Sequence, residues 1–296
     1  MKSKDNGLNL TSLDDIFGSE SSGNPSGVMN IQLNLLYPPE NHPFNVFDDS
    51  DMDELITSIK AHGVLSPGIA RPRKQGGYEL LSGNRRHHAS KLLGLEQMPV
   101  FVRDYTDDEA ILVMVDSNIQ RTNLLPSEKA HAYRMKYDAL KRQGQRNDLV
   151  GNETTKTAIE ELEETSPDTK SQIMRFIRLS YLNEDLLDMV DKKNLPMNPA
   201  VEISYLKEEE QILLFDFMGL NKVKPSLNQA KELHTLSKTS TFDKDALQEI
   251  FFKEKTDLPG IKLSPKVLKK YFPDNYTEKE MTEIILSLLN NWSKDQ

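Results

Sequence analysis

The chain has 296 residues, a formal net charge of −9 and no cysteine. Without cysteine, disulfides and thiolate metal sites are excluded, and a reducing compartment is favoured. The polar N-terminus and the absence of an 18-residue apolar run predict a cytoplasmic protein without a membrane span or a secretory signal. Because the whole chain is acidic, binding to nucleic acid would depend on local basic patches.

The first part of the chain predicts a tail followed by one α+β domain. Residues 1–27 are rich in Ser, Gly, Asn and Asp, which is typical of a disordered tail. Residues 28–122 predict a compact domain with mixed strands and helices. Its expected elements are, in chain order, a strand at 28–31, a helix at 51–62, a strand reaching residue 71, a hairpin turn at 76–77, a strand at 78–81, a helix ending at 94, a strand at 99–102, and a capped helix of about four turns from 106.

The stretch from Tyr78 to Gly94 predicts a strand, a tight turn at Gly83 and a helix that opens with two arginines. At 100° per residue, Arg85 falls within the apolar face of that helix, Arg86 at its edge and His87 on the far side. An inward arginine needs either a carboxylate partner or a bound anion. Free N–H groups at the helix N-terminus would also attract an anion, so both interpretations are kept.

A second polar position lies in the following helix, where Asn118 falls among apolar residues and Arg121 flanks it. A buried asparagine must satisfy its hydrogen bonds. It either bonds to nearby backbone or reaches a polar ligand.

Residues 123–230 predict a helical DNA-binding domain. A basic helix is expected at 128–144, with Ser127 as its cap, followed by a polar link at 145–155. Helices at 156–164 and 169–182 have the spacing of a helix-turn-helix. The exposed face of the second helix is either an ordinary solvated surface or a surface for base edges and phosphates. Its candidate DNA-binding residues are Lys170, Ser171, Gln172, Arg175 and Arg178.

Residues 231–296 predict a helical C-terminal region. Its last helix carries an apolar stripe that packs either on its own domain or on a second copy of the chain. The stripe consists of Met281, Ile284, Ile285, Leu288, Leu289 and Trp292.

Four ordered segments resemble the ParB partition protein family: residues 55–67, residues 78–89, residues 116–128 and the helix-turn-helix. Residues 183–296 more loosely resemble the C-terminal parts of ParB-like proteins from conjugative elements and plasmids of Gram-positive bacteria. The resemblance implies an α+β ParB-like N-terminal domain, a mainly α-helical helix-turn-helix domain and a helical C-terminal region.

The resemblance also implies a function. A ParB-like protein is a dimeric, DNA-binding clamp for plasmid, mobile-element or chromosome segregation, gated by CTP with Mg²⁺. It works with a ParA-type ATPase and is associated with the nucleoid or a plasmid. By position, Gly83, Arg85 and Arg86 would hold the triphosphate, and Gly63 and Pro67 would lie near the cytidine. The phosphate and metal side would be completed by Asn118, a candidate Mg²⁺ contact, and by Arg121.

Two departures bear on enzyme activity. The family glutamates before the arginine pair and before Asn118 are replaced by Asn84 and Ser117, which predicts CTP binding without efficient hydrolysis. Other functions compatible with the resemblance are a ParB-like transcriptional regulator and a nuclease of the same fold. The related sulfiredoxins need a cysteine in the 83–86 turn, and this chain has none.

Overall fold

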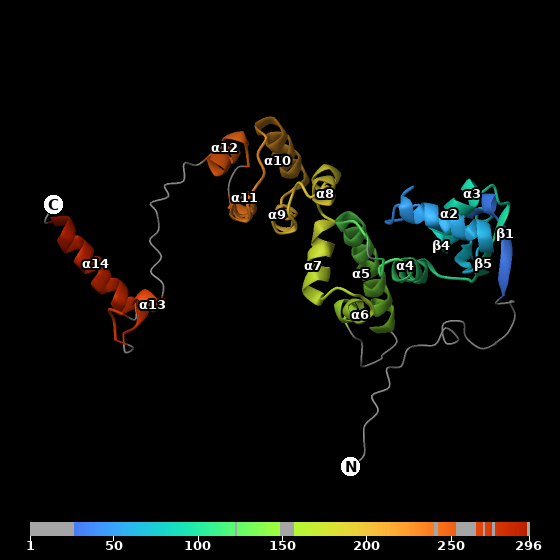
Figure 1. Cartoon of the computed structure of the whole chain (residues 1–296), viewed down its shortest axis with the longest axis horizontal. Helices are drawn as coiled ribbons and strands as arrows, with labels where there is room; N and C mark the ends of the chain where they lie inside the picture. The colour runs from blue at the N-terminus through green and yellow to red at the C-terminus, as the bar shows by residue number, and fades with distance from the viewer. Residues whose placement is uncertain are drawn as a thin grey trace, which may run out of the picture. The chain divides into compact units, whose positions relative to one another are not determined.

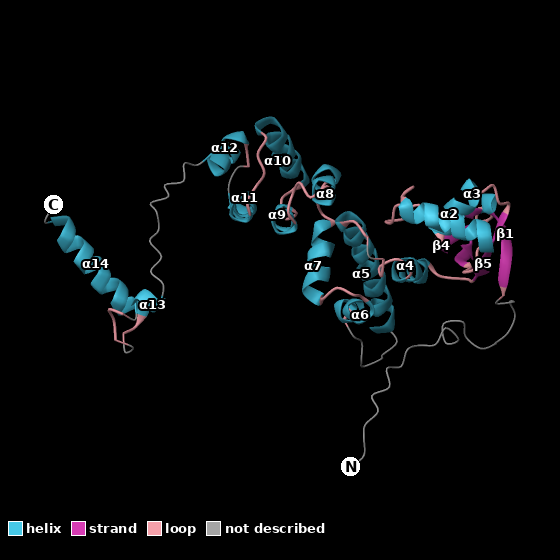
Figure 2. Cartoon of the chain, in the orientation of Figure 1, coloured by secondary structure: helices cyan, strands magenta, loops and turns pink. Residues whose placement is uncertain are grey.

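The computed structural model describes residues 27–121, 123–148, 157–239, 242–252, 265–268, 270–273 and 276–294. They belong to two compact units, one ending at residue 251 and the other starting at residue 252. In the first unit, a small sheet with its helices precedes an all-helical part (Figures 1 and 2). Residues 1–26 of the expected tail and residues 149–155 of the expected link lie outside the described residues. Residues 145–148, which we expected in that link, are instead helical and belong to the helix that begins at Pro126.

The sheet has five strands in the order β1-β5-β3-β4-β2. They are β1 (Val28–Gln32), β2 (Leu36–Tyr37), β3 (Gly68–Pro72), β4 (Tyr78–Ser82) and β5 (Gln97–Val102). β5 pairs antiparallel with β1 and parallel with β3, and β4 pairs antiparallel with β3 and parallel with β2. The sequence predicted four of these strands. It missed β2 and the preceding one-turn helix η1 (Leu33–Leu35), because such short elements contain too few residues for a periodic pattern.

Helix α3 (Asn84–Leu92) contacts α2 (Ser50–His62) and also contacts η1 and β5. It is therefore covered on more than one side, and this corrects the expected orientation of His87. That side chain is only 6% exposed, and its Nε2 donates a hydrogen bond to the backbone carbonyl of Leu33 at 2.9 Å.

The burial of His87 predicts a pH-dependent stability. Burial lowers the pKa of His87, so below about 6.5 the unfolded chain binds a proton that the folded domain resists. The free energy of unfolding should therefore fall as the pH drops from 7.5 to 5.5, by at most about 1.4 kcal/mol per pH unit for this group. Urea unfolding of the wild type and of H87Q measures it. H131Q, which changes an exposed histidine of α5, is the control, and equal pH slopes in the wild type and H87Q would contradict the prediction.

Helix α4 (Asp107–Asp116) begins with the expected capping box, in which Thr106 and Glu109 exchange hydrogen bonds. At 10 residues it is shorter than the predicted four turns, and Asn118 lies in the turn beyond it. Helix α5 (Pro126–Asp148) begins one residue before the predicted cap Ser127, since proline is favoured at the first helical position.

The remaining helices of the first unit are α6 (Ala158–Thr165), α7 (Lys170–Leu179), α8 (Glu184–Asp191), α9 (Met197–Ile203), α10 (Glu208–Asn221), α11 (Leu227–Thr239) and α12 (Lys244–Phe252). One apolar core joins residues from α7 to α12. Helix α11 crosses the domain boundary that we expected at residues 230–231 and packs on α9. The helical part therefore extends to residue 251.

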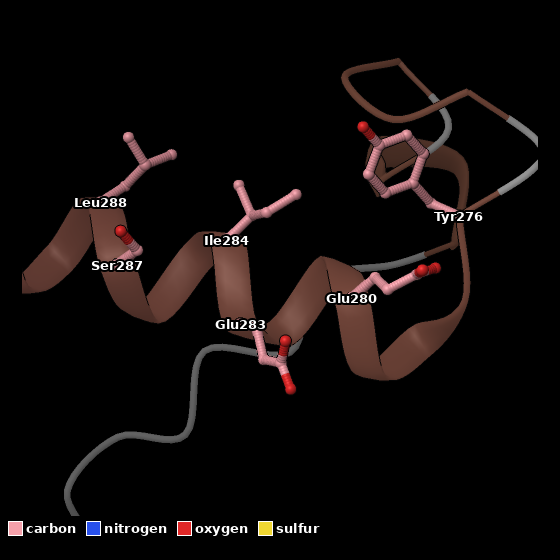
Figure 3. Close-up of a pocket in the computed structure, with 6 residues that line it drawn as sticks. All are labelled: Tyr276, Glu280, Glu283, Ile284, Ser287 and Leu288. Carbon is pink, nitrogen blue, oxygen red and sulfur yellow. The ribbon is translucent and has the colours of Figure 1, made fainter.

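The second unit contains α13 (Pro265–Leu268) and α14 (Glu278–Lys294). Tyr276 lies over the start of α14, and Ile284 and Leu288 point to the same side of the helix, whereas Glu283 points away (Figure 3). Leu288 is 63% exposed, so part of the apolar stripe is uncovered in this unit. Within the described residues, no helix has the length and apolar character needed to cross a membrane.

Candidate functional site

A cavity of about 240 Å³ lies where the start of α3, the segment before α2 and the turn after α4 meet. The side chains and backbone that line it are His42, Phe44, Asn45, Val46, Leu55, Ser82, Gly83, Asn84, Arg85, Arg86, Ser117, Asn118 and Arg121. Five of the residues proposed from the sequence are therefore brought together, from two separate stretches of the chain. Gly63 and Pro67 are not among the lining residues. Gly63 ends α2, and the carbonyl of Pro67 accepts a hydrogen bond from Arg86.

The charge of the cavity lining is one-sided. It includes three arginines, Arg85, Arg86 and Arg121, and no aspartate or glutamate. Partly buried positive charges lower the stability of the fold unless a bound anion, or carboxylates behind the cavity wall, compensate them. The arrangement therefore favours a bound anion over a neutral ligand.

The start of α3 adds backbone donors to this site. Gly83 is the N-cap residue, with φ 104° and ψ 15°, and no side chain caps the helix. The first turn of α3 has no acidic residue either. The first N–H groups of the helix therefore have no carboxylate from their own turn, which is the usual arrangement where a helix N-terminus binds a phosphate.

Gly83 is needed for two reasons, and its replacement by alanine should be destabilising. Its φ lies where a side chain is strained, and an added Cβ would lie 3.2 Å from the Cα of Gly68 and 3.3 Å from Nη2 of Arg86. G83A should lower the free energy of unfolding by about 1–3 kcal/mol. The control is G94A, because Gly94 also has a positive φ (70°) but no atom within 4 Å of the added Cβ. Equal losses for the two variants in urea unfolding would show that the close approach is unimportant.

The two arginines of α3 have different partners. Nη2 of Arg85 lies 3.3 Å from Oδ1 of Asp49, so the carboxylate interpretation describes this residue. Arg86 donates Nη1 hydrogen bonds to the backbone carbonyls of Ser66 and Pro67, and no carboxylate of the described residues forms an ion pair with it. Burial lowers the pKa of Arg86, which reflects a desolvated charge without a counterion. The anion interpretation therefore fits Arg86 better than Arg85.

Asn118 keeps both of its interpretations. Its Nδ2 donates to the carbonyl of Met114 at 2.8 Å and lies 3.1 Å from Oγ of Ser117, so it bonds to local backbone as a structural asparagine would. It also lines the cavity, beside Arg121. With its amide nitrogen occupied, Oδ1 is the atom left for a further partner.

Sequence reasoning missed His42 as a residue of this site. Its Nδ1 lies 2.7 Å from the carbonyl of Phe44, and the amide Nδ2 of Asn84 lies 3.0 Å from its Nε2. Burial lowers the pKa of His42, and the nearby Arg121 lowers it further. A lone histidine in a proline-rich segment has no spacing or periodicity that would have revealed its role.

The segment that carries His42 also connects the site to the helices behind it. Phe44 is 3% exposed and packs in the core formed by α4, α5, α6 and α7. The backbone N–H of Asn45 donates to Oε1 of Glu128 in α5 at 2.7 Å. We refer to residues 42–49 as the connecting segment, since its other end carries Asp49, the partner of Arg85.

Helices α6 and α7 form the expected helix-turn-helix, and α5 holds the turn between them. The hydroxyl of Tyr133 bonds to Oδ2 of Asp168 at 2.6 Å and to Oγ of Ser166 at 2.5 Å. Lys129 pairs with the same carboxylate at 2.7 Å. Burial, followed by the Asp168 bond, raises the pKa of Tyr133, so its proton stays in place. The start of α7 is thereby fixed relative to α5.

The candidate DNA-binding residues of α7 separate into three groups. Lys170, Ser171 and Arg175 are exposed. Gln172 is exposed as well, but its Oε1 accepts hydrogen bonds from Thr169 as part of a capping box. Arg178 donates to the hydroxyl and the carbonyl of Ser204. Met174, which we did not propose, is 49% exposed on the same helix.

The basic character of α5, which suggested a DNA-binding patch, is largely compensated within the protein. Four of its cations form ion pairs: Lys129 with Asp168, Arg134 with Asp138, Lys136 with Asp116, and Arg142 with Asp108. Three of these acids lie outside α5, so the sequence of the helix alone could not reveal the compensation. These four ion pairs reduce the positive charge that α5 could offer to DNA.

Comparisons with known proteins agree with these features. The family model of the ParB N-terminal domain matches residues 18–119. The chromosome-partitioning protein ParB of Myxococcus xanthus is 33% identical over 59% of this chain and 54% of its own. The probable chromosome 1-partitioning protein ParB of Deinococcus radiodurans is 30% identical over 68% and 65%, and a nucleoid occlusion protein of Listeria innocua is 29% identical over 62% and 60%.

Solved structures show a looser similarity. The truncated ParB of Caulobacter crescentus complexed to the centromeric parS site has a TM-score of 0.41 at 20% identity, covering 72% of this chain and all of that chain. A structural similarity at this level supports no functional conclusion. The sequence matches to the three relatives above cover 54 to 65% of the length of those relatives. The sequence matches nevertheless agree with one another: the chain contains a ParB N-terminal domain and is a relative of the ParB chromosome-partitioning proteins.

Proposed function

We propose that the cavity at the start of α3 binds the phosphates of CTP. The observation that carries this proposal is a lining of three arginines, of which Arg86 and Arg121 form no ion pair with the described residues, beside an uncapped helix N-terminus. At about 240 Å³ the cavity is smaller than the roughly 300–1,000 Å³ of typical ligand sites. It therefore suits the phosphate chain, and the cytidine would extend toward the 63–67 loop, which Arg86 ties to α3.

The lining residues fit the phosphates better than they fit Mg²⁺. Magnesium is usually held by one or two carboxylates together with substrate phosphates, whereas here the amide oxygen of Asn118 is the candidate ligand. The described residues contain no group of three or more His, Cys, Asp or Glu side chains suited to a metal ion. Mg²⁺ would therefore be carried mainly by the nucleotide, and slow hydrolysis is expected.

We further propose that the chain is a DNA-binding partition protein. The exposed Lys170, Ser171 and Arg175 of α7 would contact DNA, and the related ParB proteins are named for chromosome partitioning. The protein would be associated with the nucleoid or a plasmid and would act with a ParA-type ATPase. The uncovered apolar stripe of α14 would pair with a second copy of the chain.

A nucleotide panel tests the proposal. CTP, ATP, GTP and UTP are added separately with Mg²⁺ to the full chain, and thermal unfolding is measured with and without DNA from the native replicon. Of the four nucleotides, only CTP should raise the midpoint temperature of unfolding. A ligand that binds only the folded state stabilises it by RT ln(1 + [L]/Kd). Stabilisation by all four nucleotides would reject the cytidine preference. No stabilisation by any of them would reject the nucleotide site.

A further inference from the structure

The protonation state of His42 is fixed by its two hydrogen bonds. A carbonyl can only accept, so Nδ1 carries the proton that bonds to Phe44. The amide nitrogen of Asn84 can only donate, and its orientation is set by a further contact with the carbonyl of Leu80 at 3.4 Å. Nε2 therefore has a lone pair, and the ring is neutral.

This neutral state is tied to the absence of negative charge in the cavity. The charged groups that face His42 are Arg121, from the turn after α4, and Glu128, from α5, while α3 presents the uncharged Asn84. Desolvation of the ring and the charge of Arg121 disfavour a second proton and lower the pKa of His42, whereas the hydrogen bond to Phe44 and the charge of Glu128 favour it. A phosphate chain beside Arg121 would shift this balance toward the imidazolium.

The existing arginines leave a charge for His42 to supply. Arg85 is already paired with Asp49, and only Arg86 and Arg121 pair with no carboxylate of the described residues. A triphosphate without Mg²⁺ brings more negative charge than these two neutralise. Mg²⁺ carried by the nucleotide would compete with His42 for this role, since the lining contributes no carboxylate that would place the metal elsewhere.

We propose that His42 is a proton-linked phosphate ligand of this site. The incoming phosphate chain replaces Asn84 as the partner of Nε2, a proton from solvent is taken up at that atom, and the imidazolium donates to a phosphate oxygen. Asn84 is released to bond elsewhere. This role rests on the proposed nucleotide binding and adds to it a dependence of affinity on pH.

The test measures binding of CTP and of inorganic tripolyphosphate to the full chain between pH 5.5 and 8. Titration calorimetry in two buffers of different ionisation enthalpy gives the number of protons that the complex takes up when the ligand binds. The H42Q variant lacks the titrating ring but can still form hydrogen bonds, and H62Q alters an exposed histidine at the end of α2 as the matched control. The phosphates of the ligands also titrate in this pH range, but equally for every variant. The ratio of the affinities of two variants at the same pH is therefore independent of ligand titration.

The affinity advantage of the wild type over H42Q should grow as the pH falls between the bound and the free pKa of His42, by up to tenfold per pH unit. H62Q should behave as the wild type, and both ligands should show the effect. Equal proton uptake by the wild type and H42Q, with both binding CTP, would overturn the role of His42 and leave nucleotide binding intact. Linkage with CTP but not with tripolyphosphate would overturn the phosphate contact. No binding of either ligand would overturn the nucleotide site as well.

Discussion

Arg86→Ala is expected to lower CTP affinity by about 10- to 100-fold. Arg86 brings to the cavity a desolvated charge that no carboxylate of the described residues neutralises, and a charge-assisted hydrogen bond contributes about 1.5–3 kcal/mol. Binding to specific DNA in the absence of nucleotide should stay nearly unchanged, because the residues proposed to contact DNA are on α7. Titration calorimetry with CTP and a DNA mobility assay measure the two effects.

Controls separate a binding role of Arg86 from a structural one. The matched control K91A removes an exposed cation at the other end of the same helix and should leave CTP affinity unchanged. Arg86 also ties the 63–67 loop to α3, so urea unfolding must accompany the measurement. If R86A fails to fold, R121A removes the other arginine of the cavity that forms no ion pair with the described residues, and unchanged CTP affinity in R121A would count against the site.

Arg175→Ala and Arg178→Ala should have different effects although they are three residues apart on α7. R175A should weaken specific DNA binding by about 1–3 kcal/mol without changing stability, since Arg175 is exposed. R178A should instead lower the free energy of unfolding by about 2 kcal/mol, because the carbonyl of buried Ser204 loses its donor. The Arg178 guanidinium also lies 3.8 Å from the ring centre of Tyr205 and 4.6 Å from that of Tyr181.

Fluorescence anisotropy with native replicon DNA and urea unfolding, applied to both variants, test this pair. In R178A the loss of DNA binding should follow the loss of folded protein and be reversed by conditions that restore folding. A stable R178A that no longer binds DNA would return Arg178 to the contact surface. An R175A that binds DNA like the wild type would move the recognition surface away from this part of α7.

The sequence predicted the elements whose signals are local. Thr106 and Glu109 cap α4 as their spacing indicated, and Gly83 is the turn residue with a positive φ. The candidate site was predictable in outline, because Arg85, Arg86, Asn118 and Arg121 occur in recognisable segments and line one cavity. Local patterns are sufficient where a residue's partner lies within a few positions.

The sequence could not reveal a partner that is distant along the chain. His87 faces inward because η1 provides a carbonyl 54 positions earlier. Arg178 is occupied because Ser204, 26 positions later, lies beside it. Helical periodicity describes one amphipathic face and cannot show that a second side of the helix is also covered.

The connecting segment, residues 42–49, contacts both the cavity at the start of α3 and the helices that carry the proposed DNA-binding surface. His42 bonds to Asn84 at the start of α3, and Asn45 bonds to Glu128 of α5. Helix α5 also holds the turn of the helix-turn-helix through the bond between Tyr133 and Asp168. If the cavity binds the proposed nucleotide and the ligand shifts this segment, the free energy of the proposed DNA-binding arrangement would change as well. Linkage makes the effect reciprocal: the factor by which a bound nucleotide changes DNA affinity equals the factor by which DNA changes nucleotide affinity. A DNA site could thus select the nucleotide-bound form without any contact between the two ligands.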